Sequence, residues 1–185
     1  MTPRNALSIS AAGALLAVCL GNAHAAGMQV SSSSFADGAP IPASHANDNP
    51  PDCGGKGVSP QVSWTNLPGG AKSVAVLMWD PDGNMGFGVS HWVAYNIAAS
   101  RGQLKQGEAQ TDGHGATLGK NVRGATIYRG PCPPVGDAPH HYVLTVIATD
   151  LEANALPAGL TRDELFAALK GHALGAQSLV GRYGR

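Results

Sequence analysis

Charged residues are scarce in this chain of 185 residues, and neither sign of charge predominates. Lys and Arg number 12, Asp and Glu number 12, and together they form only 13% of the sequence, against a usual share of about 25%. A nucleic-acid-binding protein needs a surplus of basic side chains to contact phosphates, so the composition argues against that class. It also argues against intrinsic disorder, which requires low hydrophobicity and high net charge.

No apolar run reaches the length of about 20 residues that a membrane-spanning helix needs. The longest uncharged run near the start, residues 6–20, follows Arg4 and precedes Ala23-His24-Ala25. A basic residue, a short apolar segment and a small-x-small motif are together typical of a secretory signal peptide. We therefore predict a signal peptide at residues 1–25, cleaved to leave one periplasmic or secreted domain at residues 26–185.

Cysteine is also rare, with three residues in the whole chain. Cys19 lies in the predicted signal peptide and permits a lipoprotein interpretation, but Val18 is larger than the small residue usual before a lipidated cysteine. Cys53 and Cys132 remain in the mature chain. Export to an oxidising compartment favours a disulfide between them, and two separate buried thiols are the alternative.

The sequence contains no complete catalytic or cofactor-binding motif. Residues 88–92 begin like a nucleophile elbow, but Trp92 stands where the last glycine belongs. Gly119-Lys120 lacks the first glycine and the Ser or Thr of a phosphate-binding loop. No Cys-x-x-Cys or His-Glu-x-x-His pair is present for zinc. We therefore predict no cofactor, no metal ligands and no catalytic residues.

Glycine and proline are abundant, at 25 and 13 residues, and they separate a series of apolar runs. A capping box of Thr161 and Glu164 predicts one helix that ends near Gly171. Residues 38–60 and 99–141 are predicted to be mostly loop. Many strands without βαβ alternation predict a mainly β domain with helices at its edge. The predicted strands are residues 28–35, 61–65, 72–80, 91–98, 142–150 and 173–183.

Polar residues stand at the ends of three of these predicted strands. Asp80 closes the first long apolar run, His91 opens the second, and His140 and Tyr142 lead into the third. If the three strands are neighbours, these side chains meet in one cleft. Imidazole can be charged near neutral pH, and a Gly/Pro turn can present backbone N–H groups to an anion, so the cleft would suit a small anion such as phosphate. The alternative is that Asp80 only caps a turn and each histidine is structural.

Five motifs in a fixed order resemble the phosphatidylethanolamine-binding protein (PEBP) family, and in particular its bacterial YbhB/YbcL, Raf-kinase-inhibitor-like branch. The resemblance covers about residues 28 to 185. The motifs are Ser59-Pro60-Gln61-Val62-Ser63-Trp64, Asp80-Pro81-Asp82, His91-Trp92, the Gly130–Gly136 segment Gly-Pro-Cys-Pro-Pro-Val-Gly, and His140-His141-Tyr142.

The resemblance implies an antiparallel β-sandwich with a small second sheet and peripheral helices. It also implies a pocket for phosphate or a phosphorylated head group. Matching positions give the implied anion-binding residues Asp80, His91, Gly130, Pro131, His140, Tyr142 and Tyr183, with Tyr183 at the rim. Two departures bear on ligand choice: Gly83-Asn84 replaces the usual Ala-Pro, and Ser90 replaces an aromatic residue or histidine.

Two functions that use the pocket follow from these expectations, and a third is an inhibitor that acts by protein contact alone, with the pocket vestigial. The first is an exported protein that binds a small phosphate-like anion or phospholipid head group and acts as an inhibitor or modulator of a partner enzyme that the sequence does not name. The alternative is a metal- or histidine-dependent phosphoester enzyme that uses the same Asp/His cleft, since two histidines and a carboxylate can also ligate a metal.

Overall fold

The structure is a computed structural model that describes Met1 and residues 27–48 and 53–185. The predicted signal peptide at residues 1–25, with Cys19 in it, therefore lies outside the described residues apart from its first residue. In the ranges that the structure describes, no helix is long and apolar enough to cross a membrane.

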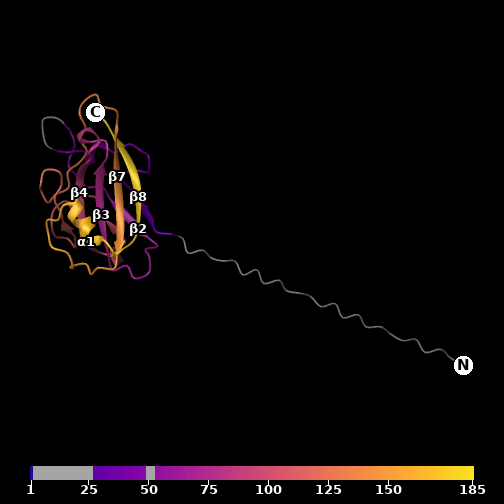
Figure 1. The fold of residues 1–185 in the computed structure, drawn as a ribbon. Coiled ribbons are helices and arrows are strands. Elements are labelled where there is room, and N and C mark those ends of the chain that lie inside the picture. Colours follow the sequence, from indigo (N-terminus) through magenta and orange to yellow (C-terminus); the bar gives the residue numbers. More distant parts are fainter. Residues whose placement is uncertain (2–26, 49–52) are drawn as a thin grey trace.

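The larger of two sheets is antiparallel and has the strand order β6-β4-β3-β7-β8. Figure 1 shows its four long strands side by side, with β8 at one edge. The four long strands coincide with predicted apolar runs, whereas the short β6 lies in a segment predicted to be loop. The bounds are β3 (Ser73–Asp80), β4 (Val89–Ala98), β6 (Thr117–Leu118), β7 (His140–Thr149) and β8 (Ala173–Tyr183).

A second, three-stranded antiparallel sheet has the order β1-β2-β5. Side chains from both sheets form one buried core, which includes Val62 and Trp64 of the small sheet with Val76 and Leu144 of the large one. This arrangement confirms the predicted fold, a mainly β sandwich with a small second sheet. The strands of the small sheet are β1 (Gln29–Ser31), β2 (Val62–Thr65) and β5 (Gln103–Leu104).

Strand β3 is apolar throughout because both of its faces are covered. Val74, Val76 and Met78 point into the core between the sheets. Ala75 and Leu77 point to the opposite face and pack in a second apolar cluster. Successive strand residues point to opposite faces, so a strand buried on both sides reads as a continuous apolar run rather than an alternating one.

The second cluster is covered by helix α1 (Arg162–Leu169), which contributes Leu165 and Leu169 to it (Figure 1). The predicted capping box is present, because the Thr161 hydroxyl accepts from the Glu164 backbone N–H and the Glu164 carboxylate accepts from the Thr161 backbone N–H. Three short 3-10 helices complete the elements: η1 (Ala43–His45), η2 (Asn84–Gly86) and η3 (Ala99–Arg101).

The central strands bring three chain positions to one edge of the large sheet. Strand β3 runs antiparallel to both of its neighbours, β4 and β7. The end of β3 therefore lies beside the start of β4 and the start of β7. This places Asp80 next to the segments that carry His91 and His140, as the sequence argument required, and it creates the floor of a pocket.

Candidate functional site

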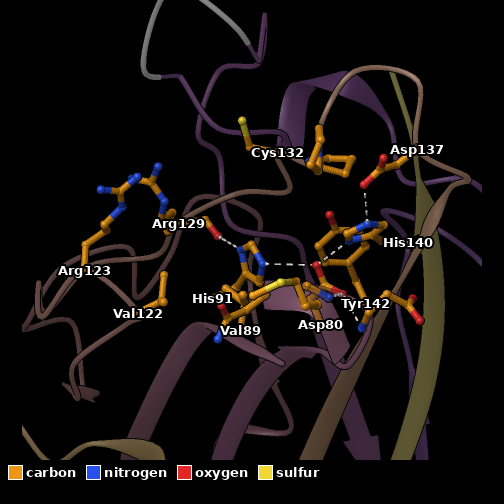
Figure 2. A pocket seen from close by; sticks show the side chains of 16 residues that line it. Asp80, Val89, His91, Val122, Arg123, Arg129, Cys132, Asp137, His140 and Tyr142 are labelled. Carbon is orange, nitrogen blue, oxygen red and sulfur yellow. Dashed lines mark hydrogen bonds and ion pairs between the residues drawn. The ribbon is translucent and has the colours of Figure 1, made fainter. Parts of the chain in front are cut away.

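A pocket of about 780 Å³ opens at this edge of the large sheet. Its floor carries Asp80 from β3, His91 from β4, and His140 and Tyr142 from β7. Figure 2 shows these four side chains converging on the same space. The structure therefore brings together four of the seven residues proposed for anion binding.

Asp80 organises the floor because its two carboxylate oxygens have different partners. Oδ1 accepts hydrogen bonds from the backbone N–H groups of Asp82 (2.9 Å) and Gly83 (3.0 Å), which closes the turn after β3. Oδ2 accepts from Nδ1 of His140 at 2.8 Å. The same carboxylate thus closes the turn and contacts a histidine of the pocket floor.

Two carboxylates hold the imidazole of His140, one at each ring nitrogen. Nδ1 donates to Asp80, and Nε2 lies 3.6 Å from Oδ2 of Asp137. Burial by itself disfavours the charged ring, but hydrogen bonding to Asp80 and Asp137 and the negative charges of Asp80 and Asp82 outweigh it and raise the pKa of His140. The pocket floor thus keeps a cationic imidazole to a higher pH than a free histidine would.

The carboxyl of Asp80 is stabilised in its ionised form. The side chain is almost completely buried, and burial alone would favour protonation. The neighbouring histidines and the backbone N–H of Gly83 have the larger combined effect, and together they lower the pKa of Asp80. Asp80 is therefore ionised, and its negative charge stabilises the neighbouring His140 imidazole rather than contacting a ligand.

His91 presents one ring nitrogen to the pocket. Its Nδ1 lies 2.9 Å from the backbone carbonyl of Arg129, which can only accept, so Nδ1 carries the proton in this pair. Nε2 is buried and has no hydrogen-bond partner within the described residues. The nearest acidic atom is Oδ2 of Asp80, at 3.9 Å, too long for a hydrogen bond. A buried polar atom without a partner is costly, so one that faces a pocket is a candidate ligand contact.

Tyr142 supplies a second buried polar atom without a partner. Its hydroxyl forms no hydrogen bond of ordinary geometry to the part of the chain that the structure describes, although the backbone N–H of Cys132 is near enough to oppose part of the rise in its pKa. The phenol packs edge-on against the His91 ring, with centroids 5.2 Å apart and an interplanar angle of 72°. Burial and the charge of Asp80 raise the pKa of Tyr142, so the hydroxyl remains a neutral donor.

Three of the proposed residues do not line this pocket: Gly130, Pro131 and Tyr183. Gly130 packs against the backbone of residues 45–47. The carbonyl of Pro131 accepts from the backbone N–H of Asn47 at 3.0 Å. The Tyr183 hydroxyl lies 3.5 Å from the carbonyl of Cys53. These contacts are structural, and a part for the three residues in anion binding stays a prediction.

Sequence reasoning missed two basic residues that do line the pocket, Arg123 and Arg129. Both belong to the long segment predicted to be loop. That loop folds back along β4: the N–H of Arg129 donates to the carbonyl of His91 at 2.9 Å, and the N–H of Val122 donates to the carbonyl of Ser90 at 2.8 Å. Local patterning carries no signal for such a tertiary pairing, so nothing in the sequence placed these guanidinium groups beside His91.

A disulfide joins Cys53 and Cys132, whose Cα atoms lie 5.4 Å apart. The sequence argument favoured this pair. Cys132 lines the pocket, so the bond ties the pocket wall to the loop that follows η1. The two cysteines are 79 positions apart in the chain.

The pairing of His140 with aspartates conflicts with holding a metal, although His91 Nε2 and the Tyr142 hydroxyl have no partner among the described residues. Within residues 27–48 and 53–185, no group of three or more His, Cys, Asp or Glu side chains could hold an ion. His140 uses Nδ1 to donate to Asp80, whereas a metal needs unprotonated nitrogen lone pairs. The arrangement favours hydrogen-bond donation to an anion instead.

The comparisons with known proteins decide the family. A profile of the phosphatidylethanolamine-binding protein family matches residues 31–184. The chain belongs to this family. YbcL of Escherichia coli is 37% identical over 142 residues, covering 75% of this chain and 77% of YbcL. Its crystal structure, described as a new member of the mammalian PEBP family, superposes with a TM-score of 0.79 at 31% identity, covering 86% of this chain and 99% of that one.

Two further members extend the comparison. A Chlamydia trachomatis structure, described as a candidate PEBP homologue, has a TM-score of 0.73 at 32% identity and covers 86% of this chain and 98% of its own. LppC of Mycobacterium tuberculosis, named as a candidate lipoprotein, is 35% identical over 156 residues, which cover 84% of this chain and 72% of LppC. The PEBP resemblance first drawn from five short motifs is therefore confirmed over nearly all of the described chain.

One departure from the PEBP motifs alters the pocket mouth. In place of Ala-Pro the chain has Gly83-Asn84, and Asn84 and the following Met85 adopt positive φ angles of 53° and 55°. Residues other than glycine rarely adopt this left-handed backbone conformation. Backbone strain of this kind concentrates at functional sites. The Met85 side chain projects into solvent at the mouth, 91% exposed.

Proposed function

We propose that this protein is an exported PEBP-family binding protein that holds a phosphate group, free or as part of a phosphorylated molecule, on the floor of this pocket. The proposal rests on one observation. His91 Nε2 and Tyr142 Oη are both buried, both without a partner among the described residues, and both face the pocket. They stand beside the imidazole of His140, whose raised pKa favours its cationic form.

These groups match the chemistry of phosphate. A phosphate oxygen can accept hydrogen bonds from a phenol O–H and from a protonated imidazole, and bonds to charged groups are stronger than neutral ones. Binding would give both atoms a partner: the Tyr142 hydroxyl donates to a phosphate oxygen, and Nε2 of His91, whose proton is on Nδ1, accepts from a phosphate O–H or donates when the ring carries both protons. Because Asp80 holds His140 in its charged form, a carboxylate beside an anion site is consistent with anion binding.

Two features support export of the protein. The Cys53–Cys132 disulfide is typical of oxidising compartments such as the periplasm. The sequence pattern at residues 1–25 is that of a signal peptide, and the relative LppC is named a candidate lipoprotein. Modulation of a partner enzyme stays a prediction, because no surface feature argues for a particular partner.

Calorimetric titration with inorganic phosphate and with phosphoethanolamine tests the proposal. We expect binding at pH 6 that weakens at pH 8.5, as His140 loses its proton. His91→Ala is expected to reduce affinity by about tenfold or more, since a hydrogen bond to a charged group contributes about 1.5–3 kcal/mol.

A matched control is His172→Ala. His172 also pairs with an aspartate, Asp150, at 2.8 Å, but on the exposed surface outside the pocket. This variant should bind like the wild type. Undiminished affinity in His91→Ala would overturn the proposal. Release of inorganic phosphate from phosphoethanolamine during the titration would favour the enzymatic alternative instead.

A further inference from the structure

Arg123 and Arg129 are the basic groups of the pocket that have no ion-pair partner among the described residues, and only the more distant carboxylate of Asp48 acts on Arg129. Both line it, and in the part of the chain that the structure describes neither guanidinium forms an ion pair or a side-chain hydrogen bond. Figure 2 shows the two guanidinium groups next to each other, on the side of the pocket that carries His91. Two adjacent like charges that form no ion pair repel each other, so an anion between them would be stabilised.

The acidic residues of the pocket are already paired with histidines. Asp80 and Asp137 contact the two nitrogens of His140, and Asp82 accepts from both the backbone N–H and Nδ1 of His141, at 2.7 and 2.9 Å. Each of these carboxylates therefore has a partner on the β7 side, although Asp80 and Asp137 share the single positive charge of His140. The charge left for a ligand to compensate is positive and lies on the side of Arg123 and Arg129.

The arginines are held in place by backbone contacts. Arg129 exchanges two hydrogen bonds with His91: its N–H donates to the His91 carbonyl, and its carbonyl accepts from His91 Nδ1, both at 2.9 Å. The buried side chain of Asn121 fixes the loop that carries Arg123, because its Oδ1 accepts from the Arg123 N–H at 2.9 Å and its Nδ2 donates to the carbonyl of Ile127 at 3.1 Å. The pair thus has a defined position relative to His91.

The size of the pocket leaves room for more than a phosphate. Its volume of about 780 Å³ falls in the range of roughly 300–1,000 Å³ that encloses drug-sized ligands. A phosphate on His91, His140 and Tyr142 occupies only the floor. The remainder of a ligand would extend past His91 toward the two arginines.

We propose that Arg123 and Arg129 form a second anion-binding subsite, so that the pocket selects phosphorylated molecules that carry a second acidic group, such as a carboxylate, close to the phosphate. This inference rests on the proposed function, which places the phosphate at His91. Arginine is suited to the role because its planar fork can donate two hydrogen bonds to one carboxylate or phosphate. An ammonium group alone at the same place would be repelled.

O-phosphoserine and phosphoethanolamine form a matched pair of probes, because they differ only by the carboxylate. In titrations at neutral pH and low salt, we expect O-phosphoserine to bind about tenfold more tightly than phosphoethanolamine. The double variant Arg123→Gln/Arg129→Gln should lose this preference, so that it binds the two probes with similar affinity. Lys105→Gln/Lys170→Gln, which removes the same charge outside the pocket, should keep the preference.

The outcomes separate this inference from the proposed function. Equal affinity for the two probes, or a preference that survives in the arginine double variant, would overturn the second subsite while phosphate binding stands. No binding of inorganic phosphate or of either probe would overturn the proposed function itself, and the subsite with it.

A vesicle assay distinguishes a soluble ligand from a lipid head group. Met85 and Val122 line the mouth with exposed apolar side chains, 91% and 50% exposed, so the pocket could meet a bilayer. Phosphatidylcholine vesicles with and without phosphatidylserine are sedimented with wild type and with the arginine double variant. Wild-type binding that requires both phosphatidylserine and the arginines assigns the subsite to a lipid; a preference seen only with O-phosphoserine assigns it to a soluble ligand. Phosphatidylserine binding that is equal in the double variant would contradict the subsite.

Discussion

Nδ1 of His140 donates a 2.8 Å hydrogen bond to Oδ2 of Asp80, and both side chains are almost completely buried. One residue ends β3 and the other begins β7, 60 positions later in the chain. The contact therefore fastens two central strands together at the pocket edge. It also sets the charge of the pocket, because the same bond lowers the pKa of Asp80 and raises that of His140.

This pair makes stability depend on pH in a predictable direction. The folded-state pKa of His140 is above its unfolded value of about 6.5. Its contribution is therefore fully present below pH 6.5 and is lost as the pH rises through the folded-state value. We expect His140→Gln to reduce the free energy of unfolding by about 1.5–3 kcal/mol at pH 6 and by less at pH 9. Urea denaturation of both proteins at the two pH values measures this.

The control for that measurement is His172→Gln. The pair of His172 with Asp150 has the same geometry but is roughly half exposed, and exposed pairs contribute only about 0–1 kcal/mol. This variant should change stability little at either pH. A loss for His140→Gln that is equally large at pH 6 and pH 9 would contradict the proposed charge of the buried ring.

Loss of the disulfide should destabilise the fold. The bond between Cys53 and Cys132 closes a loop of 79 positions, for which the chain-entropy model gives about 4 kcal/mol. We expect Cys53→Ser/Cys132→Ser to lower the free energy of unfolding by about that amount. Dithiothreitol should lower wild-type stability similarly and leave the double variant unchanged. If dithiothreitol also lowered the stability of the double variant, its effect on the wild type could not be assigned to the Cys53–Cys132 disulfide.

Gly130 should be intolerant of any side chain. A Cβ there would overlap the backbone of His45 and Ala46, which cannot move as a flexible side chain can. We expect Gly130→Ala to cost about 1–3 kcal/mol or more in urea denaturation, by overpacking. Gly69→Ala is the control, because a Cβ at Gly69 meets nothing within 4 Å and its φ is not positive. Equal stability of the two variants would contradict the prediction, because it would show that the backbone around His45 and Ala46 moves to accept a Cβ at Gly130 at little cost.

The sequence carried most of the information about the strands of the large sheet. Its apolar runs are bounded by glycine and proline, and a strand covered on both faces, such as β3, must be apolar along its length. The short strands β5 and β6, of two residues each, escaped prediction because two residues show no periodicity. The helix was predictable because Thr161 and Glu164 form its capping box locally.

The sequence by itself determined the family, the β architecture and the four side chains on the pocket floor, because strand ends and short ordered motifs are local features. Only the tertiary structure decided how those side chains share protons and which other groups join them. Packing left His91 Nε2 and Tyr142 Oη without partners among the described residues. The return of a long loop along β4 brought Arg123 and Arg129 beside His91, a pairing made by backbone hydrogen bonds that any residue could form and that no sequence pattern records.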